Sequence, residues 1–279
     1  MIPFFLLLSF GASLLASLSG GVIGSFVVIK RLANLCGSIT HAVMGGMGLF
    51  LWLQKKQGIA WCHPILGAIA ASLIAAWLIG WLHFRFRQRI DAILATIWST
   101  GMSIGIIFLA LTPGSGSDLT GFLLGNILWI SSEDLLWLAL LSFIILTLVA
   151  CFYRPFLAVC FDEEQALLQK IPLKKIYFLL LALIALTNVL LIQIIGTILT
   201  IALLTLPATT ANLFTNRLTT LMALSVLFSI AASIIGLAAS YVFDWPPGAT
   251  ISLCAAALYL VSLILKKKIL NFSRPYLAR

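Results

Sequence analysis

The chain has 279 residues, 62% of them hydrophobic and 9% charged, with a mean hydropathy of +1.16 and a net charge of +9. A soluble domain of this length needs a polar surface, so the composition excludes a soluble globular protein and indicates that lipid is the main solvent. The basic residues cluster at the ends of apolar runs rather than on one polar face, which argues against nucleic-acid binding.

Nine apolar segments follow one another along the chain. They cover residues 4–29, 33–53, 64–84, 91–112, 134–153, 175–195, 197–215, 219–243 and 248–265. Apolar segments of about 20 residues satisfy their backbone hydrogen bonds in lipid only as helices, and the alternating pattern of a membrane barrel is absent. The sequence therefore predicts an all-α, polytopic transmembrane bundle of nine spans, or of eight, because the segments between 175 and 215 are poorly separated.

The distribution of basic residues predicts how the bundle is oriented. With the N-terminus outside and the C-terminus cytoplasmic, Lys55 and Lys56 are the external ones among the 17 Lys and Arg residues. Cytoplasmic loops are enriched in Lys and Arg, so the opposite orientation is disfavoured. The first apolar run has no basic residues before it, and we expect it to remain as a span instead of being cleaved as a signal.

Two connections are longer than the others in what we expect to be a single transmembrane domain over residues 1–279. Residues 113–133 are expected outside and contain a Pro-Gly-Ser-rich stretch followed by an amphipathic run. Residues 154–175 are expected in the cytoplasm, with acidic residues at the front of a short helix, as helix N-termini prefer. Such a helix is suited to docking a soluble partner, and its candidate docking residues are Asp162, Glu163, Glu164 and Ala166; a solvated helix without a partner is the alternative.

The second span holds the strongest candidate site, because polar residues inside a membrane are costly and often functional. His41 lies well inside this span, and Thr40 and Met44 share a broad helix face with it. Imidazole is a ligand for Zn, Mn and Fe, so we expect a metal site at His41, Thr40 and Met44. Gly37 and Gly45 lie on the same face and are candidate pathway residues. The alternative is a packing histidine beside glycines that permit close helix contact.

Two further residues are candidates for the pathway or its gate. Pro207 should kink the helix that contains it and free backbone carbonyls. Asp244, in the turn before the last span, is expected outside, where a carboxylate can attract a cation.

The five cysteines show no zinc-ligand spacing, and the chain lacks a Walker A motif. The chain is therefore not expected to be an ATP-hydrolysing enzyme; if it is a pump, a second protein must supply the energy.

Several stretches, taken together in their order, resemble the permease subunits of bacterial ABC importers for zinc, manganese and iron. The resemblance covers nearly the whole chain. The stretches are residues 24–31 with the His41 span, 91–105, 118–126 (DLTGFLLGN), 161–166 (FDEEQA), 195–199 with 207–211, and 240–249.

The resemblance implies an inner-membrane complex that transports a divalent metal ion and binds no permanent cofactor. Its expected partners are a cytoplasmic ABC ATPase that docks near Asp162, an extracytoplasmic metal-binding protein, a second permease copy or paralogue, and membrane lipid. It also implies an acidic residue four positions before the histidine and a Leu-Pro-Gly after it; here Gly37 and Met44-Gly45-Gly46 stand at those places.

Three other functions remain open from the sequence. A permease for a chelated metal, siderophore or vitamin would need a wider path and no histidine ligand. A passive channel would not need the cytoplasmic helix. An intramembrane enzyme would need a strong acid or nucleophile at membrane depth, whereas the acidic residues fall near the ends of spans.

Overall fold

The computed structural model describes residues 4–59, 61–86, 90–113, 125, 130–197 and 200–273, and no strand occurs in these ranges. The all-α fold predicted from the composition is therefore confirmed. The helices are α1 (Phe4–Ile29), α2 (Ala33–Gln57), α3 (Pro64–Phe86), α4 (Ile90–Ala110), α6 (Ser132–Cys151), α7 (Tyr153–Phe161), α8 (Glu163–Leu168), α9 (Leu173–Ile195), α10 (Thr200–Asn212), α11 (Leu218–Phe243) and α12 (Pro247–Ser273).

Eight of these helices are long and apolar enough to cross a membrane within the described part of the chain: α1, α2, α3, α4, α6, α9, α11 and α12. The expected segment at 197–215 contains α10, which has only 13 residues. A helix of that length rises about 20 Å, less than the roughly 30 Å of a hydrocarbon core. The described part of the chain thus has eight candidate spans, and α10 is a shorter helix inside the bundle.

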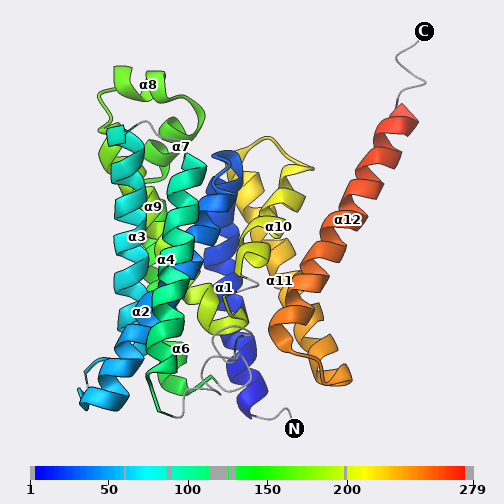
Figure 1. Cartoon of the computed structure of the whole chain (residues 1–279). Helices are drawn as coiled ribbons and strands as arrows, with labels where there is room; N and C mark the ends of the chain where they lie inside the picture. Colours follow the sequence, from blue (N-terminus) through cyan, green and yellow to red (C-terminus); the bar gives the residue numbers. More distant parts are fainter. Residues whose placement is uncertain are drawn as a thin grey trace.

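A break at Gly196 separates α10 from α9. Gly196 ends α9 with φ of 81°, a conformation that glycine adopts without strain, and α10 begins at Thr200. The helix ends at Asn212 and contains Pro207. It packs against α1, α2, α9, α11 and α12. In Figure 1, α1 begins at one end of the bundle and α12 finishes at the other. Eight full crossings would leave both of these ends on the same side, so α10 supplies the additional passage back through the bundle.

Glycine allows two pairs of helices to approach backbone to backbone. A Cβ atom on Gly46 of α2 would overlap the carbonyl oxygen of Gly67 on α3, and a Cβ on Gly67 would overlap the carbonyl of Gly46. A Cβ on Gly24 of α1 would overlap the Leu204 carbonyl of α10. In lipid, where apolar burial gives little driving force between helices, such close contact supplies much of the packing energy.

The centre of the bundle is α9, and its periphery includes α4 and α6. In the apolar window of α9, 72% of the residues are buried, against 22% in α4 and in α6. The exposed side chains of the outer helices are mostly large and apolar, for example Leu136 and Phe143 on α6. This arrangement suits a lipid environment, because an apolar outer face costs nothing there.

One end of the bundle carries the two short helices α7 and α8, which lie beyond the long helices (Figure 1). Basic residues of the described chain gather at the same end: they lie at the ends of α1 and α3, in or beside α7 and α8, and at the starts of α9 and α11. Lys55 and Lys56 lie in the last turn of α2, at the opposite end. Most basic residues of the described chain thus lie at the end that carries α7 and α8, which is the end expected in the cytoplasm from the sequence.

The expected external segment 113–133 is described only at residues 113, 125 and 130–133. Gly125 has φ of 78° and lies directly on the backbone of Ile195 and Gly196, at the break between α9 and α10. The rest of the amphipathic run from 118 to 126 lies outside the described residues. The helix that follows begins with a capping box, in which the Ser131 hydroxyl accepts from the Asp134 amide.

Candidate functional site

His41 lies on the face of α2 that meets α4. Its ring stacks on the indole of Trp98, with 4.4 Å between ring centroids and 8° between planes. The side chain is half-buried, and its Nδ1 atom is buried without a hydrogen-bond partner among the described residues. A buried polar atom with no partner is costly in an apolar environment. The stacked indole therefore fixes an imidazole ring that has an unused nitrogen.

Thr40 and Met44 are more deeply buried than His41. The Thr40 hydroxyl donates to the Cys36 carbonyl of its own helix at 2.8 Å, and the Asn188 amide of α9 donates to the same carbonyl at 3.1 Å. Met44 is 2% exposed and clusters with Leu51 and with Leu109 of α4. Both residues are packed between helices, so of the three expected ligands the imidazole has the unused polar atom.

Gly37 and Gly45 allow neighbouring helices to lie close to α2 on either side of His41. A Cβ on Gly37 would lie 3.0 Å from the Ile201 side chain of α10, and a Cβ on Gly45 would lie 2.9 Å from the Gly101 carbonyl of α4. In this structure Gly37 therefore permits close contact of α2 with α10, and Gly45 permits close contact with α4.

Sequence reasoning missed a polar face on α4, on the side of the helix turned away from α2. Four hydroxyl residues recur at intervals of three and four, which places them on one side of the helix, and all four are exposed: Thr96, Ser99, Thr100 and Ser103. The hydroxyls of Thr96 and Thr100 donate back to their own helix, at 2.8 Å and 2.7 Å. An exposed hydroxyl face at membrane depth differs from the apolar faces that meet lipid. The spacing itself was the signal that could have revealed it.

The two remaining pathway candidates lie apart from His41. Pro207 is buried within α10, where its ring cannot donate to the carbonyl of Leu203. Asp244 is exposed in the turn between α11 and α12, at the end of the bundle opposite to α7 and α8. It has φ of 52° and its amide donates to the Ser240 carbonyl, so it ends α11 as a helix cap. Within the described residues, no three His, Cys, Asp or Glu side chains are placed to hold a metal ion together.

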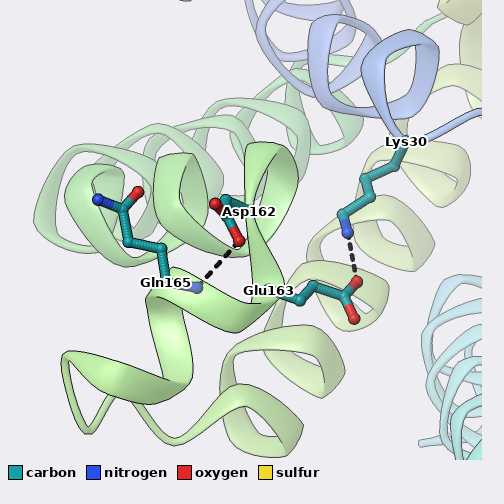
Figure 2. A network of polar contacts seen from close by, with 4 residues as sticks. All are labelled: Lys30, Asp162, Glu163 and Gln165. Atoms are coloured by element: carbon teal, nitrogen blue, oxygen red, sulfur yellow. Dashed lines mark hydrogen bonds and ion pairs between the residues drawn. The ribbon is translucent and has the colours of Figure 1, made fainter.

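The expected docking residues lie on and just before α8, and Figure 2 shows the contacts that two of their side chains make. Asp162 begins the helix by accepting a hydrogen bond from the backbone N–H of Gln165 at 2.9 Å, and Glu163 forms an ion pair with Lys30 of the α1–α2 connection at 2.6 Å. Glu164 is exposed. Ala166 is fully buried, so it packs beneath α8 and offers no surface to a partner.

This segment also has an exposed apolar surface, which the acidic residues do not provide. Leu168 is 83% exposed, Leu167 61% and Phe161 57%, although α8 lies beyond the long helices. Exposed apolar residues in an aqueous position mark interaction surfaces.

Burial raises the pKa of the nearby Cys160 thiol to about 11, an effect that Lys30 partly offsets and Glu163 reinforces. Cys160 is therefore a protonated packing residue at neutral pH.

Residues 4–266 match the family described as the ABC 3 transport family. The chain belongs to this family. As an ABC 3 protein it is the permease subunit of an ABC transporter, whose ATPase is a separate partner. A probable metal transport system membrane protein of Chlamydia pneumoniae is 42% identical over 94% of this chain and 89% of its own length.

Two further relatives extend the likeness. The manganese transport system membrane protein MntC of Halalkalibacterium halodurans is 31% identical over 92% of this chain and 86% of its own length. Among solved structures, PsaBC from Streptococcus pneumoniae, in complex with Fab, has a TM-score of 0.83 and 30% identity and covers 93% of this chain and 91% of its own. With its apolar helices, this ABC 3 permease is a multi-pass protein of the bacterial inner membrane.

Proposed function

We propose that this permease imports a bare divalent transition-metal ion and that His41 is a transient ligand on its route. The observation that carries the proposal is the half-buried imidazole, stacked on Trp98, with an unused ring nitrogen. Imidazole is a borderline ligand that suits Mn, Fe and Zn, whereas hydroxyl oxygens suit the harder of these ions. Thr40 and Met44 stay in the proposed site as neighbours that shape it.

A transport site must release its ion as readily as it binds it. One imidazole, hydroxyls and water hold a divalent ion more weakly than a full set of carboxylates and thiolates, because each lost ligand lowers the affinity. Gly37, which stands where the resemblance implies an acid, keeps the site free of a fixed negative charge. The small number of ligands thus favours release of the ion over tight binding.

The exposed face of α4 also favours a second permease copy. Hydroxyl groups at membrane depth are best satisfied by water or by another protein surface, not by lipid. A second copy packed on α4 would cover Thr96, Ser99, Thr100 and Ser103. Gly45 and Pro207 stay in the proposal as pathway candidates, and Asp244 lies at the proposed external entrance, where an extracytoplasmic metal-binding protein delivers the ion.

Uptake by reconstituted vesicles tests this function. The permease would be assembled with its ATPase and binding protein, and ATP-dependent entry would be compared among free Mn²⁺, Zn²⁺ and Fe²⁺ and the same metals as siderophore chelates. The relative named for manganese transport makes Mn²⁺ the first ion to measure. We expect uptake of a free ion; uptake of the chelate alone would support the alternative, a permease for chelated metals, and ATP-independent uptake would support a channel.

We also propose that the ATPase docks on the segment 154–175 through the apolar surface of α8. Truncating Leu168 to alanine removes a largely exposed apolar side chain and should weaken ATPase binding roughly tenfold, about 1.4 kcal/mol, as expected for an interface hot spot. Titration of the purified ATPase onto the permease measures this. The matched control is Gln169→Ala, which alters the exposed neighbour without removing apolar surface; equal binding by both variants would place the ATPase elsewhere.

A further inference from the structure

We infer that Lys30 is a positioning residue that transmits movement of the docking segment to α2, the helix that carries His41. The inference rests on the proposed function, since it concerns how ATP hydrolysis is converted into metal movement. Its basis is a contact between two parts of the chain 133 residues apart, the end of α1 and the start of α8 (Figure 2).

The ion pair between Lys30 and Glu163 is better protected than an ordinary surface pair. The Nζ and Oε1 atoms are 2.6 Å apart, and the Lys30 side chain is only 15% exposed, whereas Glu163 is 53% exposed. Fully exposed pairs contribute little because water and salt screen them. Here the lysine end of the pair is held largely within the protein.

A second contact fastens the same two regions together. Phe26, one turn before Lys30 on α1, meets the ring of Phe156 on α7 edge-on, with 5.6 Å between centroids. Both phenylalanines are fully buried. The end of α1 therefore contacts α7 through an aromatic pair and α8 through the ion pair of Lys30. We expect the docking segment and the end of α1 to move together.

The connection from Lys30 into α2 is short and tightly closed. Only Lys30, Arg31 and Leu32 separate the two helices, and the Leu32 amide donates to the Val27 carbonyl at 2.8 Å. Arg31 has φ of 55°, the left-handed conformation that ends a helix abruptly. A displacement of the end of α1 should therefore move the first turn of α2 as well, because a connection of three residues is too short to absorb it.

The connection between α1 and α2 borders open space. A cavity of about 710 Å³ lies beside it, lined by Lys30, Arg31, His83 and Asp91 among others. The connection is thus fastened to the docking segment by the ion pair and is not closely packed on every side. It therefore has room to move together with the docking segment.

The test uses the full complex of permease, ATPase and binding protein in vesicles. Lys30→Met should leave ATPase binding and ATP hydrolysis within twofold of wild type but lower the metal ions imported per ATP at least threefold. The reversed pair, Lys30→Glu with Glu163→Lys, should restore most of that ratio, and Lys30→Arg should retain it. The matched control is Lys175→Met, which removes an exposed lysine at the same end of the bundle.

A second readout makes the inference independent of the cargo. Spin labels at Gln57 in α2 and Val242 in α11, both exposed at the opposite end of the bundle, would report an ATP-dependent change in distance that Lys30→Met abolishes and the reversed pair restores. An unaltered distance change in Lys30→Met, or no rescue by the reversed pair, would overturn the inference. Loss of metal uptake in the wild type with an intact distance change would instead refute the proposed function alone.

Discussion

Replacing His41 by alanine is expected to reduce ATP-dependent metal uptake at least tenfold while the complex still assembles. The reason is that the variant removes a ring nitrogen without another partner, which we propose as the strongest ligand on the route. A tenfold loss corresponds to about 1.4 kcal/mol, the scale of one modest metal–ligand interaction. Uptake of radioactive metal into vesicles, at matched amounts of assembled complex, measures the effect.

The control for this prediction separates ligation from packing. His41→Phe keeps an aromatic ring that can stack on Trp98 but has no lone pair, so it should be as defective as the alanine variant. His63→Ala, at an exposed histidine in the α2–α3 connection, should transport normally. Wild-type uptake by His41→Phe would show that the ring serves packing, and the proposed route would then be wrong.

Replacing Gly46 by valine should prevent α2 and α3 from packing and leave little folded protein. Even the first added carbon overlaps the Gly67 carbonyl, and the Cβ of Ala71 lies only 2.5 Å from it, so the backbones must separate. Overpacking of a core costs about 1–3 kcal/mol, and the cost rises when the clash involves backbone that cannot rotate away. The amount of monodisperse protein in detergent and its thermal midpoint measure the loss.

Gly20→Ala is the matched control for this second prediction. Gly20 also lies inside a membrane-spanning helix, but its added carbon would meet only the flexible end of Leu191, at 3.5 Å. Alanine also favours the helix by up to about 1 kcal/mol over glycine. We therefore expect normal or raised stability for Gly20→Ala; equal loss in both variants would mean that any side chain at a buried glycine is harmful, whatever its neighbours.

Part of the candidate site could be predicted because it depends on local sequence. His41 could be identified because a histidine inside an apolar span is unusual, and Asp162 because an aspartate before two glutamates favours a helix start. The structure places Asp162 as the cap of α8, and His41 on the face between α2 and α4. The roles of both in transport remain predictions for the experiments above.

Other parts depend on contacts that no local pattern encodes. Glu163 and Glu164 are adjacent and chemically alike, yet only Glu163 reaches Lys30, because α8 is oriented by the burial of Ala166. Sequence reasoning treated Ala166 as a surface residue, whereas the structure buries it. Likewise, Thr40 and Met44 share a broad helix face with His41, but the packing of α9 and α4 against α2 buries both of them.

The sequence by itself determined the solvent, the helical class, the positions of eight spans and the end of the bundle where basic residues gather. These follow from composition and from backbone hydrogen bonding in lipid, which act on each segment separately. Only the tertiary structure decided that α10 is a short internal helix, that Gly46 meets Gly67, and that Lys30 is joined to Glu163. Such contacts depend on which helix faces lie against each other, and that choice is made by packing across the whole bundle.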